Sequence, residues 1–239
     1  MSEMDRNSVL VVPDVHGRDF WKKAVEETPC ERIIFLGDYF DPYPREGISA
    51  EHALEVFYEV LDLKKAHQKK VVLLLGNHDM HYLSMQFREL ACGTRYNERM
   101  APVISGLLKD NEGSFCLAHE EVVAGKRYLF THAGVTSLWY ERHQDTIKEL
   151  TAKNLNHLMA TKKGVSALAD VGRVRGGYLP SGSMLWADSD EMLSSVPFPD
   201  VYQIFGHSLQ KHDPIITAHY ACLDCRRAFL LDEKGLALV

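Results

Sequence analysis

The 239-residue sequence lacks several features that would assign it to a specialised class of protein. It has no apolar run that approaches a membrane span, and its polar start, Met1 to Arg6, lacks the apolar centre of a signal peptide. It has no Gly/Ser/Pro-rich linker and no internal repeat. A net charge of −6 disfavours binding to a nucleic-acid backbone. We therefore predict a cytoplasmic protein with a single domain, residues 1–239, and no nucleic-acid or membrane partner.

Cysteine is also scarce. Five cysteines, an odd number in a chain of this length, do not indicate a disulfide framework. Cys222-Leu223-Asp224-Cys225 has the spacing of half a zinc site, but the chain has no second pair, and the flanking residues alternate as in a strand. We therefore interpret this segment as a strand.

Three apolar runs each end in small and polar residues. The runs are 9–12, 33–36 and 71–75, and their lack of polar alternation is typical of strands buried on both faces of a parallel sheet. Open α/β sheets place their ligands at the carboxyl ends of such strands. The polar residues that follow the runs are Asp14 and His16, Asp38 and Asp41, and Asn77, His78 and Asp79. Three strands that end alike suggest one site.

The remaining pattern predicts an α/β (α+β) fold. Apolar spacing predicts helices over 18–27, 49–66 and 81–90, with Ser49 as the N-cap of the second, and one or two helices within 136–160. Residues 92–113 carry no clear pattern. A β-hairpin is expected over 115–131, and strands over 201–205, 215–217, 219–223 and 227–231. This order, βαβαβ followed by a mainly antiparallel half, fits two packed, mixed β-sheets flanked by helices.

Two further strand ends carry histidine, namely His132 and His207. A single polar residue at a strand end is usually a loop cap, so the argument depends on their number and kind. Carboxylate, imidazole and carboxamide groups bind Mn²⁺, Fe²⁺ or Zn²⁺, and a thiolate site is disfavoured because no cysteine is among them. A pair of such metals can lower the pKa of a shared water and hold a phosphoryl group for in-line displacement.

These residues lie in five short blocks that resemble, in order, the conserved blocks of the calcineurin-like metallophosphoesterase superfamily. The blocks are Asp14-x-His16, Gly37-Asp38-x-x-Asp41, Gly76-Asn77-His78-Asp79, Thr131-His132-Ala133-Gly134 and Phe205-Gly206-His207. Leu185-Trp186-Ala187-Asp188 further resembles a segment of the phosphoprotein phosphatase branch, which includes bacterial serine/threonine phosphatases. Gly76 to His81 resembles the corresponding block of bacterial symmetrical diadenosine tetraphosphatases.

The resemblance implies a four-layer αββα sandwich and two divalent metal ions per chain, with Mn²⁺ as the expected metal and iron or zinc as alternatives. It also implies in-line attack by a metal-bridging hydroxide while His78, paired with Asp41, protonates the leaving oxygen. A histidine beside a carboxylate suits this task physically. The implied ligands are Asp14, His16 and Asp38 for the first metal, and Asp38, Asn77, His132 and His207 for the second.

The chain departs from the superfamily at two positions. Leu209 stands where many members have a further histidine ligand, a loss that the phosphoprotein phosphatase branch shares. Pro42 stands where that branch usually has an arginine that binds the phosphoryl oxygens. A fixed cation is still needed for the transition-state charge. The candidates are Arg175, which precedes the Trp-Ala-Asp segment, and Arg45, which lies in the same loop as Pro42; either could instead be a solvated surface charge.

Three functions are compatible with this sequence. The first is a dinuclear metal-dependent phosphatase that hydrolyses phosphate monoesters, including those of phosphoproteins. The second is a nucleotide hydrolase of the diadenosine tetraphosphatase type, indicated by Met80-His81. The third is a metal-binding module without catalysis, which the loss of the arginine at Pro42 would allow, although the retained Asp41 and His78 disfavour it.

Overall fold

The computed structural model describes residues 8–239. They form two compact units. The first unit contains the described residues up to Cys116 together with Arg226–Val239, and the second contains Leu117–Cys225. The expectation of a single domain over residues 1–239 stays a prediction. The expectation that Met1 to Arg6 is no signal peptide concerns residues outside the described part.

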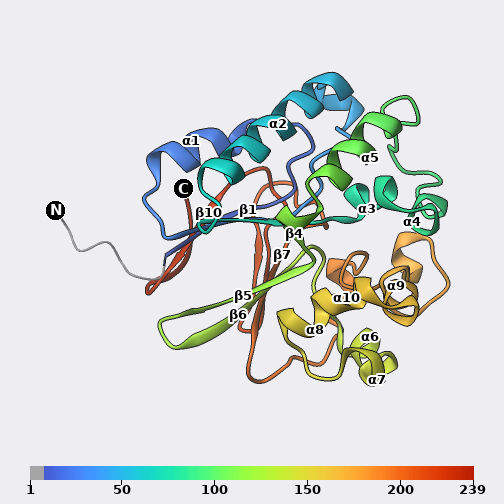
Figure 1. Cartoon of the computed structure of the whole chain (residues 1–239). Coiled ribbons are helices and arrows are strands. Elements are labelled where there is room, and N and C mark those ends of the chain that lie inside the picture. The colour runs from blue at the N-terminus through green and yellow to red at the C-terminus, as the bar shows by residue number, and fades with distance from the viewer. Residues whose placement is uncertain (1–7) are drawn as a thin grey trace. The chain divides into compact units, whose positions relative to one another are not determined.

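A six-stranded mixed sheet forms the core of the first unit, in the order β11-β10-β1-β2-β3-β4 (Figure 1). Neighbours from β1 to β4 pair in parallel, and β10 and β11 add antiparallel pairs at one edge. The three apolar runs occupy its centre, as expected, and β1 is fully buried. The bounds are β1 Val9–Val12, β2 Arg32–Phe35, β3 Val71–Leu74, β4 Phe115–Cys116, β10 Phe229–Asp232 and β11 Gly235–Leu238.

Two helices cover one face of this sheet (Figure 1). They are α1 (Phe20–Glu27) and α2 (Ala50–Ala66), both close to their predicted bounds. The Ser49 side chain accepts a hydrogen bond from the backbone N–H of His52, which confirms the predicted N-cap of α2. A short 3₁₀ turn, η1 (Pro44–Glu46), lies in the loop between β2 and α2.

The segment after β3 differs from the prediction. The structure has α3 (Asn77–Leu83) and α4 (Met85–Glu89) in place of one helix over 81–90. Ser84 is extended and caps α4 by accepting from the N–H of Phe87, so the helix breaks there. The earlier start places Asn77 and His78 in the first turn of a helix. The unpatterned residues 92–113 contain α5 (Ala101–Asp110), followed by the turn η2 (Glu112–Ser114).

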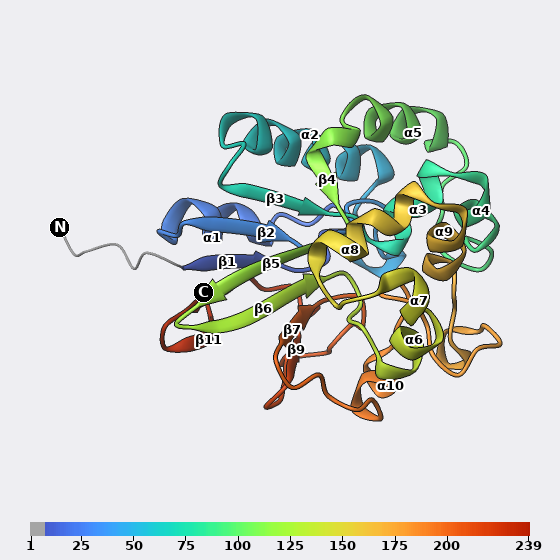
Figure 2. The same ribbon diagram turned by 60° about the horizontal axis from the view of Figure 1, so that its bottom comes forward.

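The second unit contains a five-stranded mixed sheet in the order β5-β6-β7-β9-β8. The predicted hairpin is present as β5 and β6, but its first strand begins later than expected, because the residues 115–116 pair with β3 instead. Figure 2 shows this long hairpin. The central pairs β6-β7 and β7-β9 are parallel, whereas the expected strands looked mainly antiparallel. The bounds are β5 Ala118–Val123, β6 Lys126–Thr131, β7 Tyr202–Phe205, β8 Ile215–Ile216 and β9 Tyr220–Cys222.

Short helices connect β6 to β7, where the sequence predicted one or two longer ones. Each of α6, α8 and α9 begins at a threonine whose side chain caps it, so frequent capping signals divide the region. The bounds are α6 Ser137–Arg142, α7 Gln144–Ile147, α8 Ala152–His157, η3 Leu158–Ala160, α9 Lys162–Leu168, η4 Arg173–Arg175 and α10 Ser189–Leu193.

The prediction of two mixed sheets flanked by helices is confirmed. The strand interpretation of the Cys222 to Cys225 segment is only partly confirmed, because β9 ends at Cys222 and residues 223–225 form no strand. Among residues 8–239, no helix combines the length and the apolar character needed to cross a bilayer.

Candidate active site

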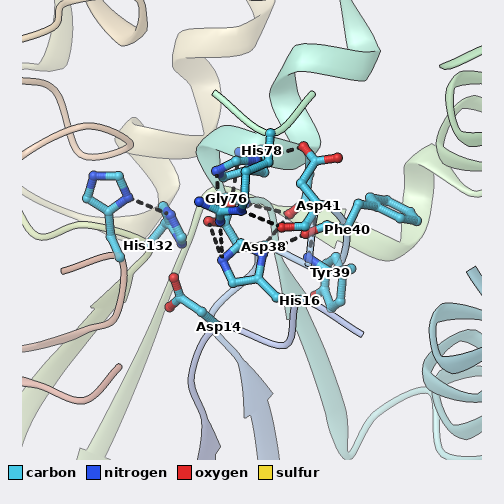
Figure 3. Close-up of polar contacts among 12 residues, drawn as sticks. Asp14, His16, Asp38, Tyr39, Phe40, Asp41, Gly76, His78 and His132 are labelled. Atoms are coloured by element: carbon cyan, nitrogen blue, oxygen red, sulfur yellow. Dashed lines mark hydrogen bonds and ion pairs between the residues drawn. The ribbon is translucent and has the colours of Figure 1, made fainter. Parts of the chain in front are cut away.

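In the first unit, the loops that leave β1 and β2 are joined through their backbones. The His16 N–H donates to the carbonyl of Asp38 at 2.7 Å, and its ring Nδ1 lies 2.6 Å from the carbonyl of Phe40 (Figure 3). His16, Asp38 and Asp41 all have positive φ, at 45°, 53° and 58°. Such left-handed backbone is uncommon outside glycine and often marks functional loops. The two strand ends thus present their side chains from one rigid loop pair.

Asp14, His16 and Asp38 form a buried group that can hold a metal ion. Each offers one ligand atom, and these atoms lie within 4.8 Å of one another. Burial lowers the pKa of His16, and the nearby Asp38 carboxylate raises it. The effect of burial is larger, so the pKa of His16 lies well below 6.5. A neutral imidazole is the form that binds metal. Two carboxylates and one imidazole therefore fit a divalent ion such as Mn²⁺, Fe²⁺ or Zn²⁺.

Asp79 holds these loops against the start of α3. Its carboxylate accepts hydrogen bonds from the backbone N–H groups of Gly76, Asp38 and Tyr39, at 2.8 to 3.0 Å. Gly37 is required at the same place, because a Cβ there would lie 2.4 Å from the backbone nitrogen of Gly76. Asp79 is thus the support of the loop, and the close approach of the two loops depends on the missing side chain at Gly37.

His78 and Asp41 lie in direct contact. The Nδ1 atom of His78 is 2.7 Å from a carboxylate oxygen of Asp41, and both side chains are buried (Figure 3). The other carboxylate oxygen of Asp41 accepts a hydrogen bond from the hydroxyl of Tyr82. Burial and the charge of Asp41 raise the pKa of Tyr82, which keeps it a donor. The predicted pair is therefore formed, and Tyr82 holds its carboxylate.

Arg95 brings a cation to the same place. Its Nε donates to the backbone carbonyl of Asp41 at 2.8 Å, and its guanidinium carbon lies 3.7 Å from the ring centroid of Tyr43. Its Nη2 atom is 3.3 Å from Nε2 of His16 and 3.4 Å from Nε2 of His78. The guanidinium is therefore held at the loop that contains Pro42.

Asn77 and His81 complete the residues from α3. Asn77 is buried at the first helical position. The ring of His81 lies 5.4 Å from that of His78, and burial together with the neighbouring His78 lowers its pKa to about 3. His81 is therefore neutral at ordinary pH and adds no charge beside His78.

In the second unit, the predicted ligands His132 and His207 lie side by side. Nε2 of His132 is 3.1 Å from Nδ1 of His207, and the N–H of Gly206 donates to the carbonyl of His132. These contacts follow from the parallel pairing of β6 with β7, which ends both strands at one edge. His207 has a φ of 63°. Its ring also lies 6.2 Å from that of Trp186.

The two predicted phosphate-binding arginines lie in different surroundings. Arg175, in η4, pairs with Asp188 through Nε at 2.7 Å and donates from Nη2 to the hydroxyl of Ser208 at 2.9 Å. It therefore lies beside His207, within the second unit. Arg45 is exposed, and its guanidinium carbon is 5.5 Å from the ring centroid of Tyr43.

Comparison with known proteins gives the family. A sequence model of the calcineurin-like phosphoesterases matches residues 8–211. The chain belongs to this family. This membership makes it a metal-dependent phosphoric ester hydrolase of a family that uses dinuclear metal centres. It confirms the resemblance seen in the five sequence blocks.

Solved structures confirm the fold of this calcineurin-like phosphoesterase. A protein serine/threonine phosphatase from Saccharomyces cerevisiae, described as similar to human phosphatase PP5, aligns with a TM-score of 0.51 and 15% sequence identity. The alignment covers 100% of this chain and 80% of the yeast chain. A search among curated proteins found no match.

Sequence reasoning missed two residues that contact the candidate site residues of the first unit, Tyr82 and Arg95. Tyr82 is four positions after His78, so it lies on the same face of a helix that begins at Asn77. A helix start placed there would have identified it. Arg95 lies between α4 and α5 in a segment without periodicity, and no local pattern connects it to Asp41, from which it is 54 residues distant in sequence.

Proposed function

We propose that this chain hydrolyses phosphate monoesters, including those of phosphoproteins, at a centre that binds two divalent metal ions. Asp14, His16 and Asp38 would hold one ion, and Mn²⁺ is the metal we expect, with iron or zinc as alternatives. The second set is Asp38, Asn77, His132 and His207. When bound, such ions supply Lewis-acid activation of water and neutralise phosphoryl charge. The buried carboxylates and imidazoles support this assignment.

The contact between His78 and Asp41 is the observation that carries the proposal. Because Nδ1 of His78 is engaged by the carboxylate, Nε2 is the ring atom from which a proton can pass to the leaving oxygen. The Asp41 carboxylate fixes the orientation of the ring, and Tyr82 fixes the carboxylate. Burial of the pair excludes bulk water as a competing proton donor.

The variant His78→Asn tests this role. We expect kcat on p-nitrophenyl phosphate to fall by about 10²–10⁴-fold, because a general acid is lost, while the Mn²⁺ content stays at the wild-type level. His52→Asn, which replaces a partly exposed histidine in α2, is the matched control and should keep the wild-type rate. A near-wild-type rate in His78→Asn would remove this residue from the mechanism.

A nucleotide hydrolase of the diadenosine tetraphosphatase type is the second candidate, and a cavity in the first unit favours it. The cavity has a volume of about 490 Å³ and is lined by His81 and Tyr96, with Arg88 and Lys109 also at its walls. A chamber of this size can receive a bulky, anionic leaving group. Diadenosine tetraphosphate, p-nitrophenyl phosphate and a phosphoserine peptide should be compared directly. Release of nucleoside diphosphates would favour this candidate, and inertness towards dinucleoside polyphosphates would exclude it.

We also propose a cytoplasmic location. The supporting observation is that the five cysteines, which all lie within residues 8–239, form no disulfide, and this suits a reducing compartment. Localisation of a tagged full-length chain by cell fractionation tests this proposal.

A further inference from the structure

Arg95 is fixed at two points, although it lies in a segment without regular structure. Its Nε is bonded to the carbonyl of Asp41, and its guanidinium plane is supported by the ring of Tyr43. Stacking on an aromatic ring and a hydrogen bond to a carbonyl both restrict the orientation of a guanidinium group. The side chain is therefore held in place before any ligand arrives.

The free end of Arg95 lies between the two histidines of the first unit that have different proposed tasks. Nη2 is 3.3 Å from Nε2 of His16, which belongs to the candidate metal-binding group, and 3.4 Å from Nε2 of His78, the proposed proton donor. The two imidazole rings are themselves 5.2 Å apart. A phosphoryl group undergoing transfer has to lie within reach of both the metal-binding group and the proton donor, and Nη2 is close to a residue of each.

The charge of Arg95 is not neutralised by a carboxylate within residues 8–239. Arg18, also in the first unit, forms a 2.7 Å ion pair with Glu46, whereas Arg95 donates a hydrogen bond to a backbone carbonyl and has only imidazole nitrogens within 3.4 Å of its Nη2 among the contacts found in residues 8–239. A cation without an acidic partner is available to an anionic ligand.

We propose that Arg95 is a catalytic residue that binds the nonbridging oxygens of the transferred phosphoryl group. The inference rests on the proposed function, since it assigns a further residue to the same site. Charge accumulates on these oxygens in the transition state, and a guanidinium can meet two of them at once. Arg95 thus supplies the fixed cation at the loop where Pro42 carries no charge, and it does so from a distant segment of the chain.

The test compares Arg95→Gln, Arg95→Lys and the control Arg99→Gln. Arg99 lies in the same segment, but its side chain is 85% exposed and pairs with Glu51. For Mn²⁺-loaded protein, we expect Arg95→Gln to lower kcat/KM on p-nitrophenyl phosphate by about 10²–10³-fold and to weaken binding of inorganic phosphate at least roughly tenfold. Arg95→Lys should lie between Arg95→Gln and the wild type, because it keeps the charge but loses the bidentate geometry. Arg99→Gln should match the wild type in both measurements.

Metal content and phosphate binding separate this role from a structural one. Unchanged Mn²⁺ content together with weakened phosphate binding supports the proposal. Wild-type phosphate affinity in Arg95→Gln would overturn it. A second result would also overturn the proposal. It is the loss of Mn²⁺ or of folding in Arg95→Gln, combined with phosphate binding in Arg95→Lys, which keeps the charge, that is no weaker than in the wild type. Should the wild-type protein hydrolyse no monoester, the proposed function fails, while calorimetric titration of phosphate into both proteins still decides the role of Arg95.

Discussion

The two units present their candidate metal ligands in different ways. In the first unit, functional side chains come from loops that are bonded to each other, as His16 is to the backbone of Asp38 and Phe40. In the second unit, His132 and His207 come from adjacent parallel strands that end at the same edge. Both arrangements include left-handed backbone, at His16 in the first unit and at His207 in the second, but the first also depends on a supporting carboxylate, Asp79, whereas strand pairing brings the two histidines of the second together.

The two units also differ in the groups that hold their arginines. Arg175 is held by the carboxylate of Asp188, which neutralises much of its charge. Arg95 is held by a carbonyl and an aromatic ring, which leave its charge available. Position near a site is therefore not sufficient evidence for phosphate binding, and the partner that fixes an arginine decides what the arginine can still bind.

The largest expected effect comes from removing a metal ligand in each unit. Asp14→Asn should lower hydrolysis of p-nitrophenyl phosphate by at least about 10³-fold and reduce bound Mn²⁺, because an amide replaces a buried carboxylate ligand. His132→Asn tests the second unit in the same assays. Asp19→Asn, which changes an exposed carboxylate just beyond the same loop, is the control and should keep wild-type activity.

Equal losses of metal in Asp14→Asn and His132→Asn would mean that both units contribute ligands to one centre. Normal metal content and activity in His132→Asn would confine the centre to the first unit and contradict the second ligand set. Robust activity in Asp14→Asn would contradict the whole assignment.

The sequence predicted the parts of the site that follow from strand ends. Buried apolar runs identify the strands of a parallel sheet, and the residues just after them must share an edge, so Asp14, Asp38 and Asn77 could be placed from local patterns. The contact between Asp41 and His78 was expected from resemblance, and the structure shows it at 2.7 Å.

The sequence could not predict contacts that depend on the path of irregular segments. Arg95 reaches Asp41 across 54 residues, and neither periodicity nor a capping signal determines the route of the chain from α4 to α5. The parallel pairing of β6, β7 and β9 was missed for a related reason, because alternation identifies a strand but not the direction of its neighbour.

A smaller effect is expected for Arg175. Arg175→Gln should lower kcat/KM on p-nitrophenyl phosphate by roughly tenfold, less than Arg95→Gln, because Asp188 already offsets its charge. Arg173→Gln, in the same 3₁₀ turn but exposed, is the matched control. A loss that equals or exceeds that of Arg95→Gln would reverse the proposed order of the two arginines.

The smallest expected effect concerns how each unit holds its loops, and it is a change in stability. In the second unit, Glu191 accepts a hydrogen bond from the N–H of Gly182 at 2.9 Å, whereas in the first unit Glu46 pairs with Arg18 and Arg226. Burial raises the pKa of Glu46, but the two arginines lower it more, so the net pKa lies below 4.5.

The stabilisation from Glu46 is therefore present above pH 4.5 and is lost as the pH falls below that value. Glu46→Gln should lower the free energy of unfolding by about 1 kcal/mol near neutral pH, since one charge of a partly exposed network is removed. Urea unfolding at about pH 7 and about pH 3.5 measures this, with the exposed Glu27→Gln as control. The difference from the wild type should shrink at the lower pH. If the difference in free energy of unfolding is the same at both pH values, Glu46 acts through packing, as a neutral side chain could. The contrast between the loop that Glu46 holds by ion pairs and the loop that Glu191 holds by a backbone hydrogen bond would then not hold.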